Sequence, residues 1–533
     1  MWVLLGVMAG GLGQTVLAAD AAGTRLDPQT TAQRIDWHLA AGWKAAGVEP
    51  APLASDAEFL RRVYLDVIGR IPRVAEVRAF LEDTRPDKRR AVIEELLASP
   101  GYGRHWTHVF RDAWLPELET DPQLSLRAGT ADFDAWLYRR LMDNMPYDQL
   151  VRELLTVPLT LANQDRLVRD SALMSRPSPL LFFTAKEGKP ENLASATARM
   201  FLGLRLECAQ CHHHPTAPWR QEQFWGYAAF FAGIQAQPMS AVLREVPDRT
   251  ELVIPGSGSV VRAAFLDGRP LEHLGRDSPR QRLAEWITAR DNPYFAKALV
   301  NRVWEQFFGI GLVDPVDDME ADNLPSHPEL LEELAMAFAQ AGFDLKFLIR
   351  AITLSQAYQR SSAGTGGDPE ELRLFARMPV KGLTAQQVAD SLLVALHGPA
   401  QRDPVSVPDP EQRASPDGLL ETLAQFRGSL HKRHEPQLSI LQALTLMNGP
   451  LIRKATSSSE GRMLTAVAEA PFLDPRQRLE TLFLATLSRP PTEQELQRLL
   501  PYLESGGATG DPRKALADVF WVLLNSGEFL LNH

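Results

Sequence analysis

Cys208 and Cys211 are the only two cysteines of the 533-residue chain, and three histidines, His212, His213 and His214, follow them directly. The spacing Cys-x-x-Cys-His is that of covalent haem c attachment. Two thiols one helical turn apart can add to the two vinyl groups along one side of a porphyrin, and the next histidine can bind the iron. Because the chain has no other cysteine, chance is a poor explanation of this spacing. The sequence therefore predicts haem c at Cys208, Cys211 and His212.

Three other uses of the same residues stay open. Cys208, Cys211 and two of the histidines could bind zinc or another divalent metal, and His214 is then the added ligand that haem attachment does not need. The two cysteines could also cycle between dithiol and disulfide, although no thioredoxin-like βαβ pattern surrounds them. A structural disulfide without chemistry is the third use.

A haem iron would take a sixth ligand, and the sequence does not single one out. His213 and His214 are too near His212 to reach the opposite face of the porphyrin. The more distant candidates are Met200, Met319, His105, His108 and His327. Two of them have simpler explanations. Met200 lies on an apolar helix face, and His327 is expected at a helix start where Ser326 and Glu329 would form a capping box.

Charged residues accompany the motif. Arg199 and Arg205 could pair with haem propionates, although solvated surface arginines are the simpler expectation. The segment 314–322 is rich in carboxylates, and oxygen-rich loops can bind calcium. Its spacing is not that of an EF-hand, so we expect a solvated turn. The acidic residues are Asp314, Asp317, Asp318, Glu320 and Asp322.

No other motif assigns a catalytic residue. The sequence has no Gly-x-Ser-x-Gly elbow, Walker loop, dinucleotide fingerprint or His-Glu-x-x-His pair. The net charge is −10 and the pI is near 5.7. Since no run of Lys and Arg stands out either, nucleic acid is not expected as a partner.

The start of the chain is apolar and carries no charge before Asp20. Small residues at Ala18 and Ala19 are of the kind that a signal peptidase recognises. Residues 1–19 are therefore predicted to be a signal peptide. The run is short and Gly-rich for a spanning helix, and no later stretch is long and apolar enough to cross a bilayer. We expect an exported protein, periplasmic or extracellular, without a membrane span after cleavage.

Apolar residues recur with a period near 3.6 in both halves of the chain, which predicts helices. The stretch SDAEFLRRVYLDVIGRIP shows the pattern. Ser55 is placed as a helix cap with Glu58 as in a capping box, and Phe59, Val63 and Val67 form an apolar stripe. Further along, the helix before Pro100 is expected to stop at that proline.

The elements around the Cys/His motif are also expected to be helical. A helix that opens at Pro190 is predicted to run into the motif, and the aromatic stretch 221–234 is predicted to form a helix after it. The aromatic rings could wall off a cofactor from water, although ordinary core packing is the simpler expectation.

The predicted fold class is mainly α, with two helical domains. The first spans 30–234 and the second spans 279–533. Between them, residues 235–278 contain short β-like runs and glycine turns. We expect this segment to be a β-containing linker.

Several long stretches resemble one family of two-part secreted proteins that are abundant in planctomycetes. They include EFLRRVYLDVIGRIPRVAEVRAFLED, ATARMFLGLRLECAQCHHHPTAPW, DNPYFAKALVNRVWEQFFGIGLVDPVDDM and LLNSGEFLLNH. The resemblance implies a cytochrome-c-like domain of unknown function (DUF1549) followed by a second domain of unknown function (DUF1553). Many members read Cys-Ala-x-Cys-His-Asp/Asn-His-Pro-Phe. This chain departs from that pattern at His213 and Thr216 and keeps the pair His214-Pro215.

Three hypotheses about function follow. The first is covalent haem c binding and electron transfer with an unknown redox partner or envelope protein. The second is a metal-dependent hydrolase or carbohydrate-active envelope protein that uses the Cys/His cluster. The third is a non-catalytic scaffold of the envelope. Whether the chain is an enzyme is left open. Haem would give visible absorption and a covalent pigment, whereas zinc would give neither.

Overall fold

The fold is that of a computed structural model, which describes residues 26–120, 130–159, 177–236, 243–272, 277–320, 322–363, 372–396, 440–457 and 460–533. The predicted signal peptide, residues 1–19, lies outside this range. Within the described residues, no helix combines the length and the apolar character needed to cross a membrane.

Helices make up nearly all of the ordered elements, so the predicted mainly α fold class is confirmed. The first region contains α1 (Pro28–Ala46), α2 (Asp56–Ile68), α3 (Val74–Glu82), α4 (Lys88–Ala98), α5 (Pro100–Trp114), α6 (Glu117–Thr120), α8 (Thr130–Met142), α9 (Tyr147–Leu155), α11 (Leu181–Ala185), α12 (Pro190–Thr197), the π-helical turn η1 (Ala198–Leu202), the 3-10 turn η2 (Glu207–Gln210), α13 (Gln221–Ala228) and the 3-10 turn η3 (Ala229–Phe231).

The second region is helical as well. It contains α14 (Pro279–Ile287), α15 (Phe295–Phe308), α16 (Pro328–Gln340), α17 (Leu345–Leu354), α19 (Ala385–Leu396), α21 (Ile440–Asn448), α22 (Pro450–Ala455), α23 (Arg462–Ala468), α24 (Pro475–Leu487), α25 (Glu493–Glu504), the 3-10 turn η5 (Gly507–Thr509), α26 (Pro512–Leu524) and the 3-10 turn η6 (Glu528–Leu530).

Short strands lie between the two helical regions, as the sequence predicts. There, β1 (Ile234–Ala236) pairs antiparallel with β2 (Leu243–Glu245), and β3 (Glu251–Val253) pairs antiparallel with β4 (Val260–Arg262). A third antiparallel pair was not predicted. It joins β5 (Lys381–Gly382) to β6 (Leu531–Asn532), and so brings the last residues of the chain beside the middle of the second region.

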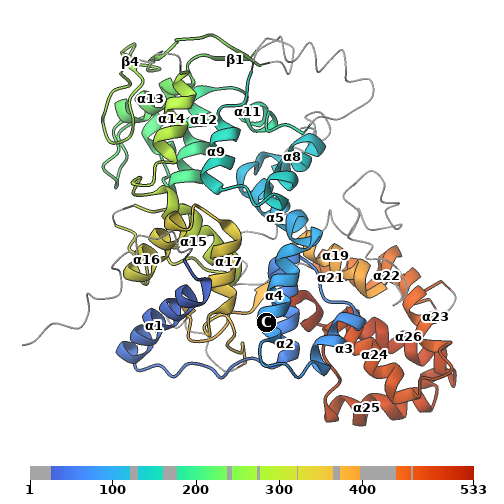
Figure 1. The fold of residues 1–533 in the computed structure, drawn as a ribbon. Helices are drawn as coiled ribbons and strands as arrows, with labels where there is room; N and C mark the ends of the chain where they lie inside the picture. Colours follow the sequence, from blue (N-terminus) through green and yellow to red (C-terminus); the bar gives the residue numbers. More distant parts are fainter. Residues whose placement is uncertain are drawn as a thin grey trace, which may run out of the picture.

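The two helical regions interlock along a shared interface. Figure 1 shows α14 at the top among α9, α12 and α13, although α14 belongs to the second region. In the lower half, α1 packs against α16 and α17, and α3 packs against α24. The Trp106 ring of α5 lies 6.0 Å from the Phe307 ring of α15. Buried apolar side chains of both regions therefore form one continuous core.

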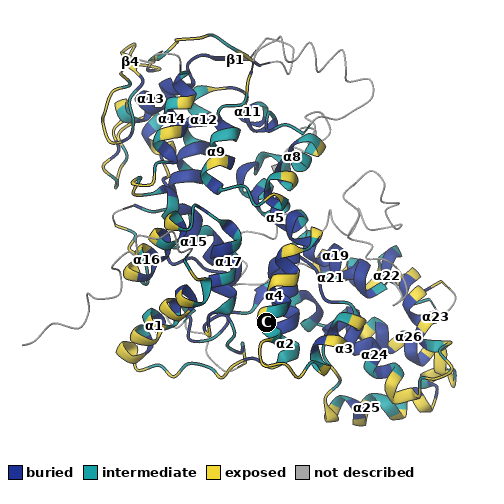
Figure 2. Cartoon of the chain, in the orientation of Figure 1, coloured by how far each residue is buried: buried dark blue, intermediate teal, exposed yellow. Residues whose placement is uncertain are grey.

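Burial follows this arrangement. In Figure 2 the central helices α2 and α17 are mostly dark blue, whereas the peripheral helices α1 and α25 carry yellow outer faces. Every residue of α2 from Phe59 to Ile68 is buried. The stripe of Phe59, Val63 and Val67 accounts for one side of this helix. The opposite, polar side is also covered by protein, which the periodicity did not predict.

Two arginines on that polar side bind main-chain carbonyls of the C-terminal residues. The Arg61 guanidinium donates to the carbonyls of Thr486 (3.0 Å), Phe529 (2.9 Å) and Glu528 (3.2 Å). Burial lowers the pKa of Arg61 to about 10, so the group stays charged at neutral pH. A guanidinium suits this site because its five N–H groups can serve several acceptors at once.

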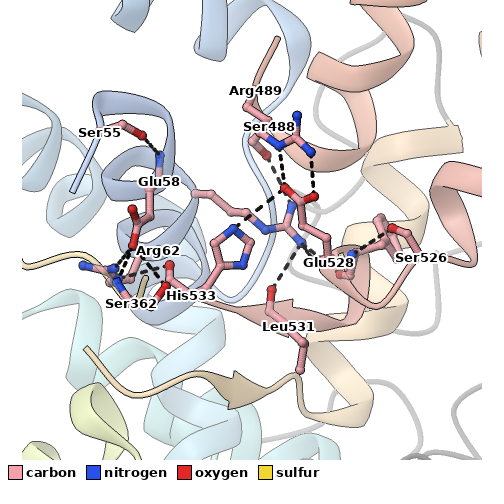
Figure 3. Close-up of polar contacts among 12 residues, drawn as sticks. Ser55, Glu58, Arg62, Ser362, Ser488, Arg489, Ser526, Glu528, Leu531 and His533 are labelled. Atoms are coloured by element: carbon pink, nitrogen blue, oxygen red, sulfur yellow. Dashed lines mark hydrogen bonds and ion pairs between the residues drawn. The ribbon is translucent and has the colours of Figure 1, made fainter. Parts of the chain in front are cut away.

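Arg62 completes this contact, and Figure 3 shows its surroundings. The guanidinium donates to the carbonyls of Tyr358 (2.7 Å), Arg360 (2.8 Å) and His533 (3.2 Å). It also donates to the Glu58 carboxylate at 2.7 Å, a contact visible in Figure 3. The predicted cap is present, since Ser55 accepts from the Glu58 amide at 3.2 Å. The capping-box role of Glu58 is wrong, because its carboxylate turns to Arg62 and the serines at 361 and 362 instead.

Asp66, one turn further along α2, lies at the centre of a fully buried polar cluster. Its carboxylate accepts from Lys381 Nζ (2.8 Å), Asn532 Nδ2 (2.7 Å) and the Tyr358 hydroxyl (2.9 Å). All four side chains are buried. Lys381 also donates to the Phe307 carbonyl. The cluster therefore links α2, α15, β5 and β6 through hydrogen bonds made away from water.

One of two predicted helix boundaries is confirmed and the other is corrected. The helix before Pro100 ends at Ala98, as predicted, and Pro100 is the first residue of α5, a position where its missing N–H costs nothing. The helix cap expected at Ser326 is in fact His327, and no side chain caps α16. Pro328 occupies the first turn of that helix and sets the start one residue later.

Candidate functional site

The Cys/His motif lies on its own short turn, separate from the preceding helix. We expected the helix from Pro190 to continue into the motif. Instead, α12 and η1 end at Leu202, and Gly203 takes a left-handed conformation with φ +67°. A glycine adopts this conformation without the steric cost of a Cβ. The 3-10 turn η2 then carries Cys208 and leads directly to Cys211.

Both thiols are free and exposed at the surface. No disulfide joins Cys208 to Cys211, so an inert disulfide is not the form seen here. Of the two residues between them, Ala209 is fully buried and packs the turn against the core. This arrangement leaves the two sulfur atoms open to a reagent or cofactor from solution.

The aromatic helix α13 holds the turn in place. Trp225 Nε1 donates to the Gln210 carbonyl at 3.0 Å. The side-chain amide of Gln221 donates to the carbonyls of Gln210 (3.1 Å) and Cys211 (3.0 Å). The ring of Trp225 is buried, as are those of Phe224 and Tyr227. These aromatic residues therefore belong to the core and support the turn, which confirms the expectation of ordinary core packing.

The three histidines differ in their ring hydrogen bonds. His212 Nδ1 lies 2.7 Å from the His213 carbonyl, so Nδ1 carries the proton and Nε2 keeps a lone pair. His214 Nδ1 accepts from the Ala217 amide at 2.9 Å. His213 Nδ1 accepts from the main-chain N–H of Gln221 at 3.1 Å. Because the rings of His213 and His214 accept through Nδ1, their lone pair lies at Nδ1, and among the three rings that of His212 is the one whose lone pair lies at Nε2.

The donor groups at the motif do not converge on one point. Among the residues described by the structure, no three or more His, Cys, Asp or Glu side chains are placed to hold a metal ion together. A zinc site built from Cys208, Cys211 and His214 would require a different tautomer of His214 and a rearranged loop.

The acidic segment packs against this loop. The Trp219 indole N–H donates to both carboxylate oxygens of Glu320, at 2.9 and 3.0 Å. Only 9% of the Glu320 surface is exposed. Burial raises the pKa of Glu320, and the hydrogen bond from Trp219 and the nearby His214 oppose that rise. The expected solvated turn is wrong for Glu320, which is part of a buried contact.

The two arginines near the motif face the same segment. Arg199 lies 3.9 Å from Asp317, and Arg205 lies 3.8 Å from Asp318. Arg302 of α15 also pairs with Asp317. Arg205 is exposed, as expected of a surface arginine, whereas Arg199 is partly buried, and both lie beside carboxylates of the second region. A propionate at Arg199 or Arg205 would compete with these carboxylates.

The sixth-ligand candidates are spread through the fold. Met200 and His105 are buried in the core, and the His105 ring lies edge-on to Trp106. His108 lies on α5 and His327 at the start of α16. Met319 contacts the segment that leads into the motif, because its amide donates to the Gly203 carbonyl at 2.8 Å. A Cβ on Gly203 would lie 3.0 Å from Met319 Cγ.

His327 should make stability depend on pH. Burial, with His38 and Arg373 nearby, lowers the pKa of His327 from 6.5 to about 4. The unfolded chain then binds a proton that the folded chain does not, so stability is fully present above pH 6.5 and falls as the pH drops toward 4. The variant His327→Gln should lose less in melting temperature between pH 7 and 4.5. The exposed His213→Gln is the control, and an equal pH slope in all three proteins would contradict the prediction.

Sequence reasoning missed the partner of Trp219. Glu320 lies 101 positions later and was considered only as one of several acidic residues. A glutamate between Met319 and Ala321 in an otherwise acidic segment gave no signal of burial. Arg61 and Asp66 were missed for the same reason, since a polar side chain on a helix is expected to face solvent.

Two family models match the chain. Residues 34–236 match PSCyt2, a protein of unknown function (DUF1549). Residues 279–503 match PSD1, a protein of unknown function (DUF1553). The chain therefore has the two-domain arrangement DUF1549 followed by DUF1553, in the order that the resemblance implied. A search of curated proteins and a search of solved structures found no significant match.

Proposed function

We propose that this protein binds haem c covalently through Cys208 and Cys211, with His212 on the iron, and takes part in electron transfer. The observation that carries the proposal is the ring of His212. Its Nδ1–H is held by the His213 carbonyl at 2.7 Å, which leaves Nε2 free as a ligand. Metal-bound histidines generally donate their other N–H in this way. When bound, haem would supply a one-electron redox centre.

Each residue of the motif has a separate task in this proposal. Cys208 and Cys211 offer exposed thiols on one turn, and Trp225 keeps that turn fixed through the Gln210 carbonyl. His212 would orient its ring by the hydrogen bond to the main chain. Since the thiols are at the surface, an attached group would lie near solvent and be open to a redox partner.

We also propose that the protein is exported to the periplasm or the cell exterior and is one of the secreted planctomycete proteins that it resembles. The apolar, uncharged residues 1–19 support export. Thioether attachment takes place after export, so the two proposals are consistent with each other.

Protein purified from its native envelope tests these proposals together. We expect a Soret band, an intact mass that exceeds the polypeptide by one haem, and a mature N-terminus near residue 19 or 20. A bare polypeptide mass without visible absorption would overturn the haem proposal. Stoichiometric zinc in that sample would instead favour the metal-dependent hydrolase or carbohydrate-active alternative.

Variants of the motif should separate attachment from iron ligation. Cys208→Ser and Cys211→Ser should each lose one thioether bond and yield less pigment. His212→Ala should keep the covalent pigment and change its spectrum, because the iron loses its ligand. Glu222→Gln is the matched control, because Glu222 is an exposed acid near the motif, and it should leave both readouts unchanged. Equal pigment and equal spectra in all four variants would contradict the assigned roles.

A further inference from the structure

A carboxylate of the second region is buried against the loop that follows the Cys/His motif. Glu320 receives the Trp219 indole N–H on both oxygens, at 2.9 and 3.0 Å. Next to it, the Met319 amide donates to the Gly203 carbonyl at 2.8 Å. The motif is therefore held from two sides, by α13 of its own region and by this acidic segment.

Side-chain hydrogen bonds fix the position of the acidic segment. The Asn301 side chain of α15 donates to the Val313 carbonyl at 2.8 Å and accepts from the Val313 amide at 2.9 Å. The Asn323 side chain donates to the Asp318 carbonyl at 2.8 Å. Because both asparagines tie main-chain groups together, the position of Glu320 is set by the helix α15 and by its own loop.

From Glu320 a short series of hydrogen bonds leads to His212. The Trp219 indole N–H donates to the Glu320 carboxylate. The main-chain carbonyl of Trp219 accepts from the main-chain N–H of His214 at 2.8 Å. The neighbouring His213 carbonyl lies 2.7 Å from His212 Nδ1. Orienting the His213 carbonyl also orients the imidazole, so the tryptophan contact determines where His212 Nε2 points.

We propose that Glu320 is a positioning residue for His212 and that the cofactor site is completed only by the second region. The effect of Glu320 on a haem ligand rests on the proposed function. The effect of Glu320 on the position of the loop 212–219 concerns the polypeptide alone and can be measured in protein with or without pigment. Loss of a group that orients a metal ligand from outside the coordination sphere typically lowers metal affinity or activity by about 10- to 100-fold.

Three variants of the mature full-length chain test the role. Glu320→Ala removes the acceptor of the Trp219 N–H, whereas Glu320→Gln keeps a carbonyl acceptor in the same place. Glu222→Gln is the matched control, because Glu222 is an exposed acid 3.9 Å from His213 on the other side of the loop. If Glu320→Ala does not fold, Trp219→Phe removes the same hydrogen bond and keeps most of the ring packing.

The first readout is hydrogen exchange of the peptide 212–219 in the protein as isolated. We expect roughly tenfold faster exchange in Glu320→Ala and wild-type exchange in Glu320→Gln and Glu222→Gln. The second readout is the electron paramagnetic resonance spectrum of the ferric pigment, which depends on the orientation of the imidazole. It should change in Glu320→Ala and return in Glu320→Gln, a recovery that general destabilisation would not produce.

The two proposals can fail separately. Wild-type protein without pigment would overturn the proposed function, and the exchange data would still decide whether Glu320 positions the loop. Pigmented wild-type protein with unchanged exchange and spectrum in Glu320→Ala would overturn the positioning role. Faster exchange in Glu320→Gln equal to that in Glu320→Ala would also overturn it, because the acceptor oxygen would then be irrelevant.

Discussion

Replacement of Asp66 by alanine is expected to lower the free energy of unfolding by about 3–5 kcal/mol. The Asp66 carboxylate accepts hydrogen bonds from Lys381 (2.8 Å), Asn532 (2.7 Å) and Tyr358 (2.9 Å), all of them buried. Without the carboxylate, the Lys381 ammonium keeps its carbonyl partners but loses this counter-charge at a fully buried position. Urea unfolding followed by far-UV circular dichroism measures the change.

Two further variants make the Asp66 prediction specific. The double variant Asp66→Ala, Lys381→Met removes both charges and should recover part of the loss, because an apolar pair can replace a buried ion pair at little cost. Asp56→Ala is the matched control on the same helix. Asp56 pairs with Lys88 and Arg89 at the partly exposed surface, so its removal should cost about 1 kcal/mol or less. Equal effects of Asp66→Ala and Asp56→Ala would contradict the prediction.

Arg61→Ala is expected to cost at least about 3 kcal/mol, because it removes charged hydrogen bonds to several buried carbonyls. The guanidinium binds the carbonyls of Thr486, Glu528 and Phe529 at 2.9 to 3.2 Å. These groups belong to the end of α24 and to the last residues of the chain. Hydrogen exchange of the peptide 525–533 should therefore rise in this variant well above that of the rest of the core.

Two further variants test whether the planar guanidinium of Arg61, with its several donors, is responsible for the expected loss. Arg61→Lys keeps the charge but not the planar set of donors, so we expect most of the loss to remain. Arg78→Ala is the matched comparison, since the exposed Arg78 also reaches α24 but through one hydrogen bond, to Thr481 at 3.0 Å. Its removal should cost less than about 1 kcal/mol. Unchanged exchange of 525–533 in Arg61→Ala would show that the arginine does not hold the C-terminal residues.

Local sequence patterns predicted those features of the fold that depend on neighbouring residues. The apolar stripe of Phe59, Val63 and Val67 is buried as expected, and the cap at Ser55 is present. Short strands also lie between the two helical regions, where β-like runs were predicted. In each case the pattern and the structure lie within one turn or one hairpin, where few alternatives compete.

The burial of the polar side of α2 could not be predicted from local sequence patterns. Arg61, Arg62 and Asp66 have the spacing of a solvated helix face. Apart from Glu58, which binds Arg62, the partners described here lie more than 290 positions away, at Tyr358, Lys381 and the end of the chain. Nothing in the helix itself shows whether water or protein will cover that face. The outcome depends on how α24, β5 and β6 pack around it.

For the candidate site, the sequence by itself determined the chemical types and their spacing: two thiols one turn apart and a histidine directly after them. The tertiary structure alone decided that the preceding helix ends at Leu202, that His212 keeps a free Nε2, and that Glu320 lies buried beside Trp219. The physical reason is the range of the interactions. Spacing along a turn is fixed by covalent geometry, whereas tautomers, burial and ion pairs depend on which distant groups the packed core brings within hydrogen-bond distance.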